Sequence, residues 1–284
     1  MAACLDEMIS GKSGAIQHVG ERVVLEAQRN EIHRLWDELS DFNLSQPKAA
    51  ITHAMARLCE FGGVWNATWA GAIRIDGAGR ADPLRGWRVA AGEALHPILL
   101  QSDGKHMAGV MEVWDRGGID PSFLIPLKNV GAFRTYSLRR DLPADWFDTP
   151  FYRKHYGFCD IHDVAFVAFP LNEDCESHFA FYSHHPIADE TFALLTYALR
   201  GIKWFHRHMM LSHGLLVAKA PLTGTEQKVL QGLLTGATEK NIARRIGLAD
   251  STTHQHVVAI FRKYGVKSRA ALMSLWLSGA GGAG

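Results

Sequence analysis

The sequence predicts an α+β domain, with an antiparallel sheet flanked by helices, followed by an all-α domain of four short helices. The chain has 284 residues, which is a usual length for two domains. Strand-like and helical patterns both occur before residue 217, whereas only short helical patterns follow Pro221. Lys219-Ala220-Pro221 interrupts the pattern, so we place the domains at 1–218 and 219–284, with a glycine-rich tail at the end.

The elements of the first domain follow from apolar spacing and from proline and glycine. Helices are predicted where apolar residues recur every three or four positions, and strands where β-branched and aromatic residues lie between turn residues. Pro47 suits the first turn of a helix and Gly62-Gly63 its end, while Asp189 is a reasonable N-cap. The expected helices are 21–39, 47–62, 106–114, 143–146, 150–155 and 189–216, and the expected strands are 64–75, 86–89, 133–138, 164–169 and 178–183.

Charge is distributed unevenly along the chain. The net charge is +1, but from Lys219 onward nine Lys and Arg oppose three Asp and Glu. The last part is therefore basic and the first part acidic, which favours a local site for a polyanion in the second domain.

Cysteine spacing and hydropathy point to a cytoplasmic protein. Cys4, Cys59, Cys159 and Cys175 are scattered without CxxC spacing, which fits a reducing compartment. The N-terminus lacks a basic region followed by an apolar stretch, and the apolar run 164–171 is too short to span a bilayer. We therefore expect neither a secretory signal nor a membrane partner.

Four helix signals follow Pro221. Thr223 and Glu226 have capping-box spacing, Thr238 can start a second helix that Gly247 closes, and Asp250 or Ser251 can cap a third. A fourth helix spans 270–277. Two helices joined by a tight glycine-containing turn form a helix-turn-helix, whose second helix lies in the DNA major groove. The outward face of that helix carries Ser251, His254, Gln255, Val258 and Arg262.

This region resembles the LuxR-type helix-turn-helix of bacterial regulators. The resemblance rests on Leu222-Thr223, Glu226, Val229-Leu230, Gly236, Ile242-Ala243, Thr252, His256-Val257, Ile260-Phe261-Arg262-Lys263, Gly265-Val266 and Ser268-Arg269. Two positions depart from the usual pattern, since Ala249 stands where a capping serine is common and Thr253 where a buried valine is common.

The resemblance implies a regulator that binds double-stranded DNA and contacts RNA polymerase. It implies base reading by His254, Gln255 and Val258, and phosphate contacts by Lys240, Thr252, Arg262 and Lys263. It also implies a dimer face on the last helix through Leu272, Leu275 and Trp276. A homodimer is expected, because the helical stretch 189–216 has more apolar faces than one small sheet needs and the final helix is expected to expose Leu275 and Trp276.

The first domain does not alternate strands and helices as a phosphoacceptor receiver does. It is similar to the autoinducer-binding domains of quorum-sensing regulators or to a GAF- or PAS-like sensor. Six aromatic residues either wall a pocket for a small apolar ligand or fill the core: Trp65, Trp69, Trp87, Trp114, Tyr136 and Trp146. The alternative is a protein-interaction or dimerisation module without a ligand.

Catalytic and metal signals are weak. Neither 159–162 (Cys-Asp-Ile-His) nor 206–208 (His-Arg-His) has a zinc-site spacing. A nucleophile and base at Cys159 and its neighbouring histidines lack an orienting partner. We therefore expect no enzyme activity, no metal site and no cofactor.

Overall fold

The first domain contains a five-stranded antiparallel sheet, as the sequence predicts. The computed structural model describes residues 26–75, 82, 84–97, 119–217 and 220–277. The strand order is β2-β1-β5-β4-β3, and every neighbouring pair is antiparallel. The strands are β1 (Asn66–Arg74), β2 (Trp87–Ala94), β3 (Arg134–Ser137), β4 (Asp163–Asn172) and β5 (Cys175–Ser183).

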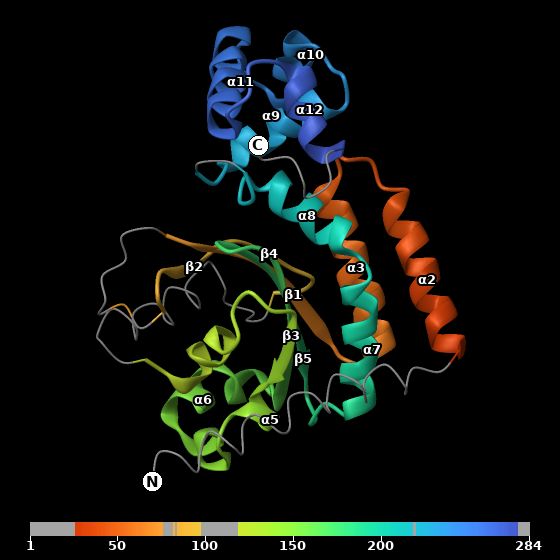
Figure 1. Cartoon of the computed structure of the whole chain (residues 1–284), viewed down its shortest axis with the longest axis vertical. Helices are drawn as coiled ribbons and strands as arrows, with labels where there is room; N and C mark the ends of the chain where they lie inside the picture. The colour runs from red at the N-terminus through yellow and green to blue at the C-terminus, as the bar shows by residue number, and fades with distance from the viewer. Residues whose placement is uncertain (1–25, 76–81, 83, 98–118, 218–219, 278–284) are drawn as a thin grey trace.

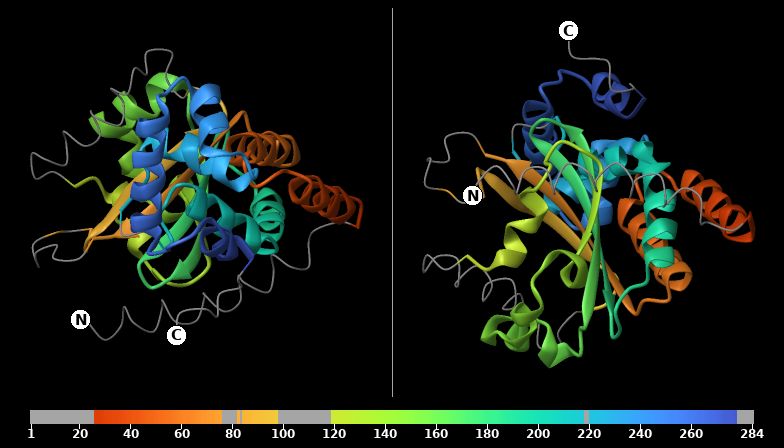
Figure 2. Two further views of the ribbon diagram at one scale, coloured as in Figure 1. Left: turned by 90° about the horizontal axis from the view of Figure 1, so that it is seen from above. Right: turned by 60° about the horizontal axis from the view of Figure 1, so that its bottom comes forward.

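Helices cover the two faces of this sheet (Figures 1 and 2). One face packs against three helices, α3 (Pro47–Gly62), α7 (Asp189–Arg200) and α8 (Lys203–Ser212). A fourth helix, α2 (Glu26–Ser40), packs on the side of α3 that faces away from the sheet. The other face packs against shorter ones: α5 (Leu138–Asp141), α6 (Pro150–His155) and 3-10 turns at Pro121–Phe123, Ile125–Leu127, Ala144–Asp148 and Gly157–Cys159. The helix expected over 106–114 lies outside the described residues.

Alternation along the strands divides the apolar residues between two cores. Phe179 and Phe181 of β5 point toward the long helices, as does Trp69 of β1. Ala180 between them points to the opposite face, where it joins a cluster with Tyr136 and Trp146. Side chains alternate across a strand, so one sequence builds both layers.

The predicted single helix over 189–216 is wrong, because the structure divides it into α7 and α8. Gly201 lies at the break, where an added Cβ would come within 2.4 Å of the Trp36 ring. The indole Nε1 of Trp36 donates a hydrogen bond of 2.9 Å to the Ala198 carbonyl near the end of α7. The side chain from α2 thus fills the position beside the break and satisfies a carbonyl there.

The second domain consists of four helices in the predicted order. They are α9 (Gly224–Leu234), α10 (Glu239–Ile246), α11 (Asp250–Tyr264) and α12 (Arg269–Leu277). The Thr223–Glu226 capping box is confirmed, as is the cap at Thr238. Gly247 ends α10 with φ 74°, a left-handed conformation that glycine adopts without steric cost.

Two predicted N-caps are wrong. Ala249 occupies the cap position of α11, and Asp250 and Ser251 are already inside the helix. Likewise Ala188 precedes α7, and Asp189 is its first residue. Asp250 and Asp189 still place a negative charge in the first turn, where the helix dipole favours it.

The last turn of α8 is part of the core of the second domain. Leu211 packs with Leu222 and the helices that follow, and its carbonyl accepts a hydrogen bond from the Tyr264 hydroxyl at the end of α11. Arg207 of α8 donates a hydrogen bond of 2.8 Å to the Leu275 carbonyl of α12. In Figure 1 the second domain accordingly stands at the end of α8. The boundary at 218/219 remains a prediction.

Trp276 is buried, with 6% of its surface exposed, and packs in this same core. The expectation that α12 exposes it is therefore wrong. The spacing of apolar residues on a short helix does not tell which neighbouring element covers them, and here α8 and α11 cover this end of α12. Leu277, one residue later, is 83% exposed.

Candidate nucleic-acid interface

One face of α11 is exposed to solvent over its whole length. Ser251, His254, Gln255, Val258 and Arg262 are all exposed, with Val258 52% exposed despite being apolar. Their spacing of three and four residues places them on one side of the helix. This is the face that the sequence predicts for DNA contact.

The opposite face of α11 anchors the helix in the domain core. Thr253, Val257, Ile260 and Tyr264 are buried and pack against α9 and α10. Among the described residues, the Thr253 Oγ1 has no hydrogen-bond partner, which is consistent with an apolar position occupied by a polar side chain. A buried hydroxyl without a partner costs about 1–3 kcal/mol.

The His254 side chain contacts a residue of the neighbouring helix α10. Its Nδ1 lies 3.0 Å from the Glu239 carboxylate at the start of α10, and both side chains are largely exposed. Contacts of this kind at the surface contribute little to stability. The pair instead restricts the orientation of the imidazole.

The predicted phosphate-binding cations differ in their surroundings. Lys240 and Arg262 are exposed, and Thr252 is half-buried near the start of α11. Lys263 is engaged within the domain, because its ammonium lies 2.7 Å from the Glu226 carboxylate and donates 2.8 Å to the Pro221 carbonyl. Its side chain is only 19% exposed.

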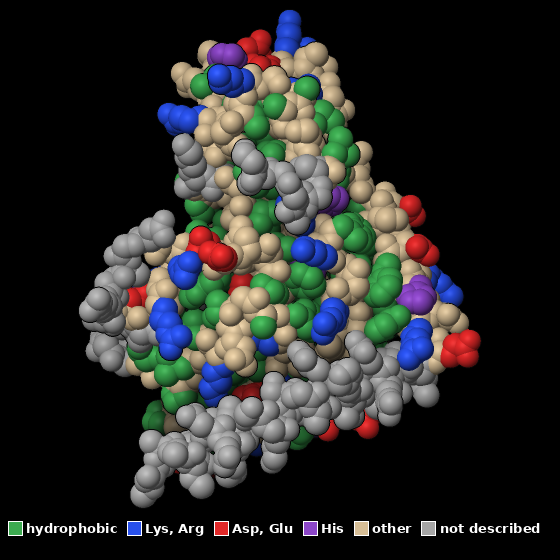
Figure 3. Space-filling model, in the orientation of Figure 1, with side chains coloured by type: hydrophobic (Ala, Val, Ile, Leu, Met, Phe, Trp, Pro, Cys, Tyr) green, Lys and Arg blue, Asp and Glu red, His purple; other side chains and the backbone are tan. Residues whose placement is uncertain are grey.

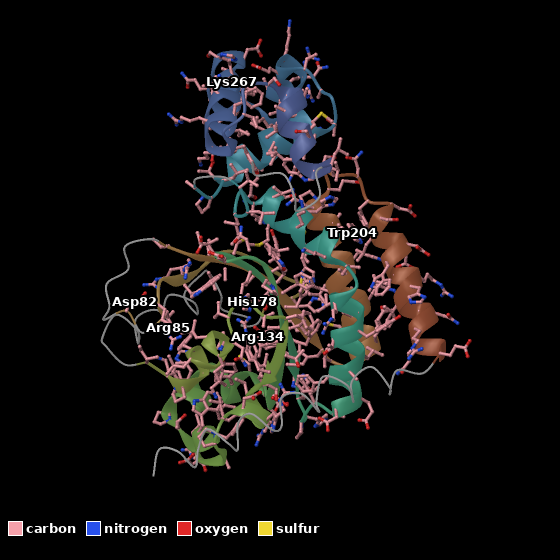
Figure 4. All side chains as sticks on the ribbon, viewed as in Figure 1. Asp82, Arg85, Arg134, His178, Trp204 and Lys267 are labelled. Carbon is pink, nitrogen blue, oxygen red and sulfur yellow. The ribbon has the colours of Figure 1, made fainter. Side chains whose placement is uncertain are left out.

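Other exposed cations of the second domain are absent from the predicted site. Arg244 and Arg245 lie on α10, and Lys267 follows α11. Figure 4 shows Lys267 at the end of the molecule farthest from the sheet, and Figure 3 shows Lys and Arg side chains projecting from that part of the surface. The high local count of basic residues was the signal that pointed to them, but it does not identify single positions.

The predicted ligand-binding aromatics separate into groups. Tyr136 and Trp146 are buried in the cluster on the α5–α6 face of the sheet, and Trp65 packs against it. Trp69 belongs to the opposite core, where its Nε1 donates 2.8 Å to the Ser177 hydroxyl. Trp87 is buried at the start of β2. Trp114 lies outside the described residues.

A buried polar network on the α5–α6 face was missed by the sequence analysis. Arg134 makes two hydrogen bonds to the Glu176 carboxylate, at 2.9 and 2.8 Å, and His178 lies 3.1 Å from it. Figure 4 shows Arg134 and His178 over the sheet. Burial alone would raise the pKa of Glu176, but the hydrogen bonds from His178, Arg134 and the Gly131 amide outweigh it and lower the pKa to about 2. Glu176 and His178 are neighbours on one face of β5, but Arg134 lies 42 residues from Glu176 along the chain, so sequence spacing does not reveal the network.

None of the helices within the described residues has the length and apolar character needed to cross a membrane. Within the same ranges, no group of three or more His, Cys, Asp or Glu side chains is placed to hold a metal ion.

The exposed face of α11, its buried counterpart and the preceding turn define a helix-turn-helix DNA-binding domain. Residues 220–276 match the family model described as bacterial regulatory proteins, luxR family. The second domain is thus a luxR-family DNA-binding domain of a transcription regulator, as the sequence resemblance implies. The match covers about a fifth of the chain. No curated protein sequence matches the chain.

Solved structures with a similar arrangement are distant. The VqsR LBD domain from Pseudomonas aeruginosa is 14% identical with a TM-score of 0.42, over 66% of this chain and 98% of that one. SdiA in complex with octanoyl-rac-glycerol is 11% identical with a TM-score of 0.41, over 87% of this chain and 92% of that one. Escherichia coli SdiA is 11% identical with a TM-score of 0.39, over 86% and 94%.

Proposed function

We propose that the chain acts in the cytoplasm as a homodimeric transcription regulator that reads its operator with α11. The observation that carries the proposal is the continuous exposed face of α11 in a luxR-family domain. Buried residues on the other face fix the helix in place, so the exposed side chains are presented by a rigid element.

Base reading is assigned to His254, Gln255 and Val258. The amide of glutamine pairs with adenine through two hydrogen bonds, and an apolar side chain can contact the methyl group of thymine. Phosphate contacts are assigned to Ser251, Thr252, Lys240 and Arg262, since phosphate contacts set register and affinity without reading sequence. Lys263 was expected to join them, but its bonds to Glu226 and Pro221 favour a role in holding the end of α11.

The assignment is tested by titrating the full chain with operator and non-operator duplexes at several salt concentrations. We expect Gln255→Ala to reduce discrimination by about 1–3 kcal/mol and to leave non-specific binding nearly intact. We expect Arg262→Ala to weaken both duplexes and to lower the salt slope by about one. Arg153→Ala on α6 is the matched control and should change neither. Equal losses of specific and non-specific binding in Gln255→Ala would contradict base reading by this helix.

For the first domain we propose a small, mainly apolar ligand on the α5–α6 face of the sheet. The support is the aromatic cluster there and the Trp65 indole Nε1, which is buried and has no hydrogen-bond partner among the described residues. Such an N–H can donate to a ligand acceptor. Native mass spectrometry of protein from its own host should show a retained mass, and repeated absence of any added mass would favour the alternative, a protein-interaction or dimerisation module.

The homodimer rests on general grounds and on one surface feature. Symmetric dimers are the commonest assembly, and helix-turn-helix dimers bind two half-sites. Leu277 at the end of α12 is an apolar residue that is 83% exposed, which suits a helix-to-helix contact. Sedimentation at micromolar concentration, with and without DNA, should give a dimer, and a monomer in both would contradict it.

Contact with RNA polymerase is proposed from the family alone, and loss of transcription activation by a DNA-binding-competent α9 or α10 surface variant would support it.

A further inference from the structure

A cavity lies where the two domains meet. Its volume is about 360 Å³, within the range of small-molecule sites. Its walls come from the α2–α3 connection, from α8 and from the second domain. The lining includes Phe42, Ala50, Trp204, His208, Leu234 and Trp276.

The walls are mainly apolar, with a few polar groups. Figure 4 shows Trp204 on α8, just below the second domain, and this side chain is 36% exposed. His208 hydrogen-bonds the Trp276 backbone, and the Ser212 hydroxyl donates 2.8 Å to the His208 carbonyl. This composition suits a ligand with an apolar body that is oriented by one or two hydrogen bonds.

Among the described wall residues, one buried side-chain polar atom lacks a hydrogen-bond partner. Trp276 is 6% exposed, and within the described part of the chain its indole Nε1 makes no hydrogen bond. Leaving a buried donor unsatisfied costs about 1–3 kcal/mol, so nearly all such groups in folded proteins are paired. A hydrogen-bond acceptor reaching this N–H through a small adjustment of the wall would remove that cost.

We propose that this cavity is a binding site for a compact, mainly apolar molecule with a carbonyl or carboxylate acceptor. The acceptor bonds the Trp276 indole, and the apolar body packs between Trp204, Phe42 and Leu234. The site is distinct from the sheet face proposed above for the first domain. Because its walls belong to both domains, a bound molecule favours the arrangement that brings them together, which links its concentration to the position of the DNA-binding domain.

The test uses acetophenone as the probe and ethylbenzene as its counterpart without an acceptor. The chain has eight tryptophans, so its indole N–H signals can be resolved by ¹⁵N NMR of the full-length protein and assigned with Trp276→Phe and Trp65→Phe. We expect acetophenone to shift the Trp276 signal saturably, to leave the Trp65 signal in place, and to bind roughly tenfold more tightly than ethylbenzene. A shift of the Trp65 signal alone would locate binding on the sheet face and overturn the proposal.

Two variants test the location. Ala50→Met inserts a longer side chain into the cavity from α3, while Ala49→Met makes the same change at the neighbouring exposed position and is the matched control. Ala50→Met should weaken acetophenone binding at least tenfold, and Ala49→Met should leave it unchanged. Trp204→Ala removes a partly exposed wall residue and should also weaken binding, which keeps the test open if Ala50→Met folds poorly. Wild-type binding in both Ala50→Met and Trp204→Ala would refute the site, as would equal affinity for acetophenone and ethylbenzene.

Discussion

Replacing Lys263 with alanine separates a structural role from a DNA-binding role. The ammonium bonds a Glu226 carboxylate that is only 7% exposed. Burial would raise the pKa of Glu226, but the hydrogen bonds from Lys263 and from Thr223 outweigh it and keep the carboxylate charged. Without Lys263, that charge stays in the capping box of α9 with fewer partners.

The magnitude follows from this burial. Removing one partner of a fully buried ion pair costs about 3–5 kcal/mol, and an exposed pair contributes under about 1 kcal/mol. Lys263 is about a fifth exposed, so we expect Lys263→Ala to lower the free energy of unfolding by about 1–3 kcal/mol. Its exposed neighbour Arg262 is the matched control, and Arg262→Ala should stay within about 0.5 kcal/mol of the wild type.

The assay combines urea unfolding with DNA titrations at several salt concentrations. If the reasoning is right, Lys263→Ala loses stability and keeps the wild-type salt slope at concentrations where it is folded, whereas Arg262→Ala shows the reverse. A double-mutant cycle with Glu226→Gln should give a coupling energy well above zero. Unchanged stability in Lys263→Ala together with a salt slope lower by about one would show that Lys263 meets phosphate instead.

Three further predictions concern the fold. The folded pKa of Glu176, about 2, lies below its unfolded value, so its pairing stabilises the protein above about pH 4.5. This contribution of up to about 3 kcal/mol is lost as the pH falls toward 2. The free energy of unfolding measured across that pH range should show the loss, and a value independent of pH would contradict the network. Leu211→Ala should lower the free energy of unfolding by about 2–5 kcal/mol and reduce DNA binding at temperatures where the wild type is folded. A wild-type melting curve would mean that α8 does not contribute to the core of the second domain. Gly201→Ala should lower the free energy of unfolding by about 1–3 kcal/mol through overpacking. The control Gly224→Ala has open space around it and should be near neutral or stabilising. Similar melting temperatures for the two variants would argue against the close contact at the α7–α8 break.

The sequence allowed accurate prediction where the determinants are local. The capping box at Thr223 and Glu226, the cap at Thr238 and the glycine at 247 all act within one helix turn, and each was found where expected. The hairpin of β4 and β5 is also local, since a short turn joins two strongly apolar strands. The exposed face of α11 follows from helix periodicity alone.

Prediction was poorer where distant residues decide the structure. The break after α7 depends on Trp36, more than 160 residues away along the chain from Gly201. The burial of Trp276 depends on α8, and the state of Lys263 depends on a glutamate in another helix. Periodicity identifies an apolar or a charged side chain, but it does not name the partner that the fold supplies.

The position of Leu211 bears on how this regulator can be dissected or recombined. A fragment that begins at Lys219 lacks the leucine that fills part of its own core and the carbonyl that Tyr264 bonds. Hybrid regulators that exchange DNA-binding modules would therefore preserve more native contacts if the crossover point lay at the α7–α8 break near Gly201. In that design α8 is transferred together with the DNA-binding helices that it packs against. The surface of α8 that contacts the sheet must then be complementary to the new first domain.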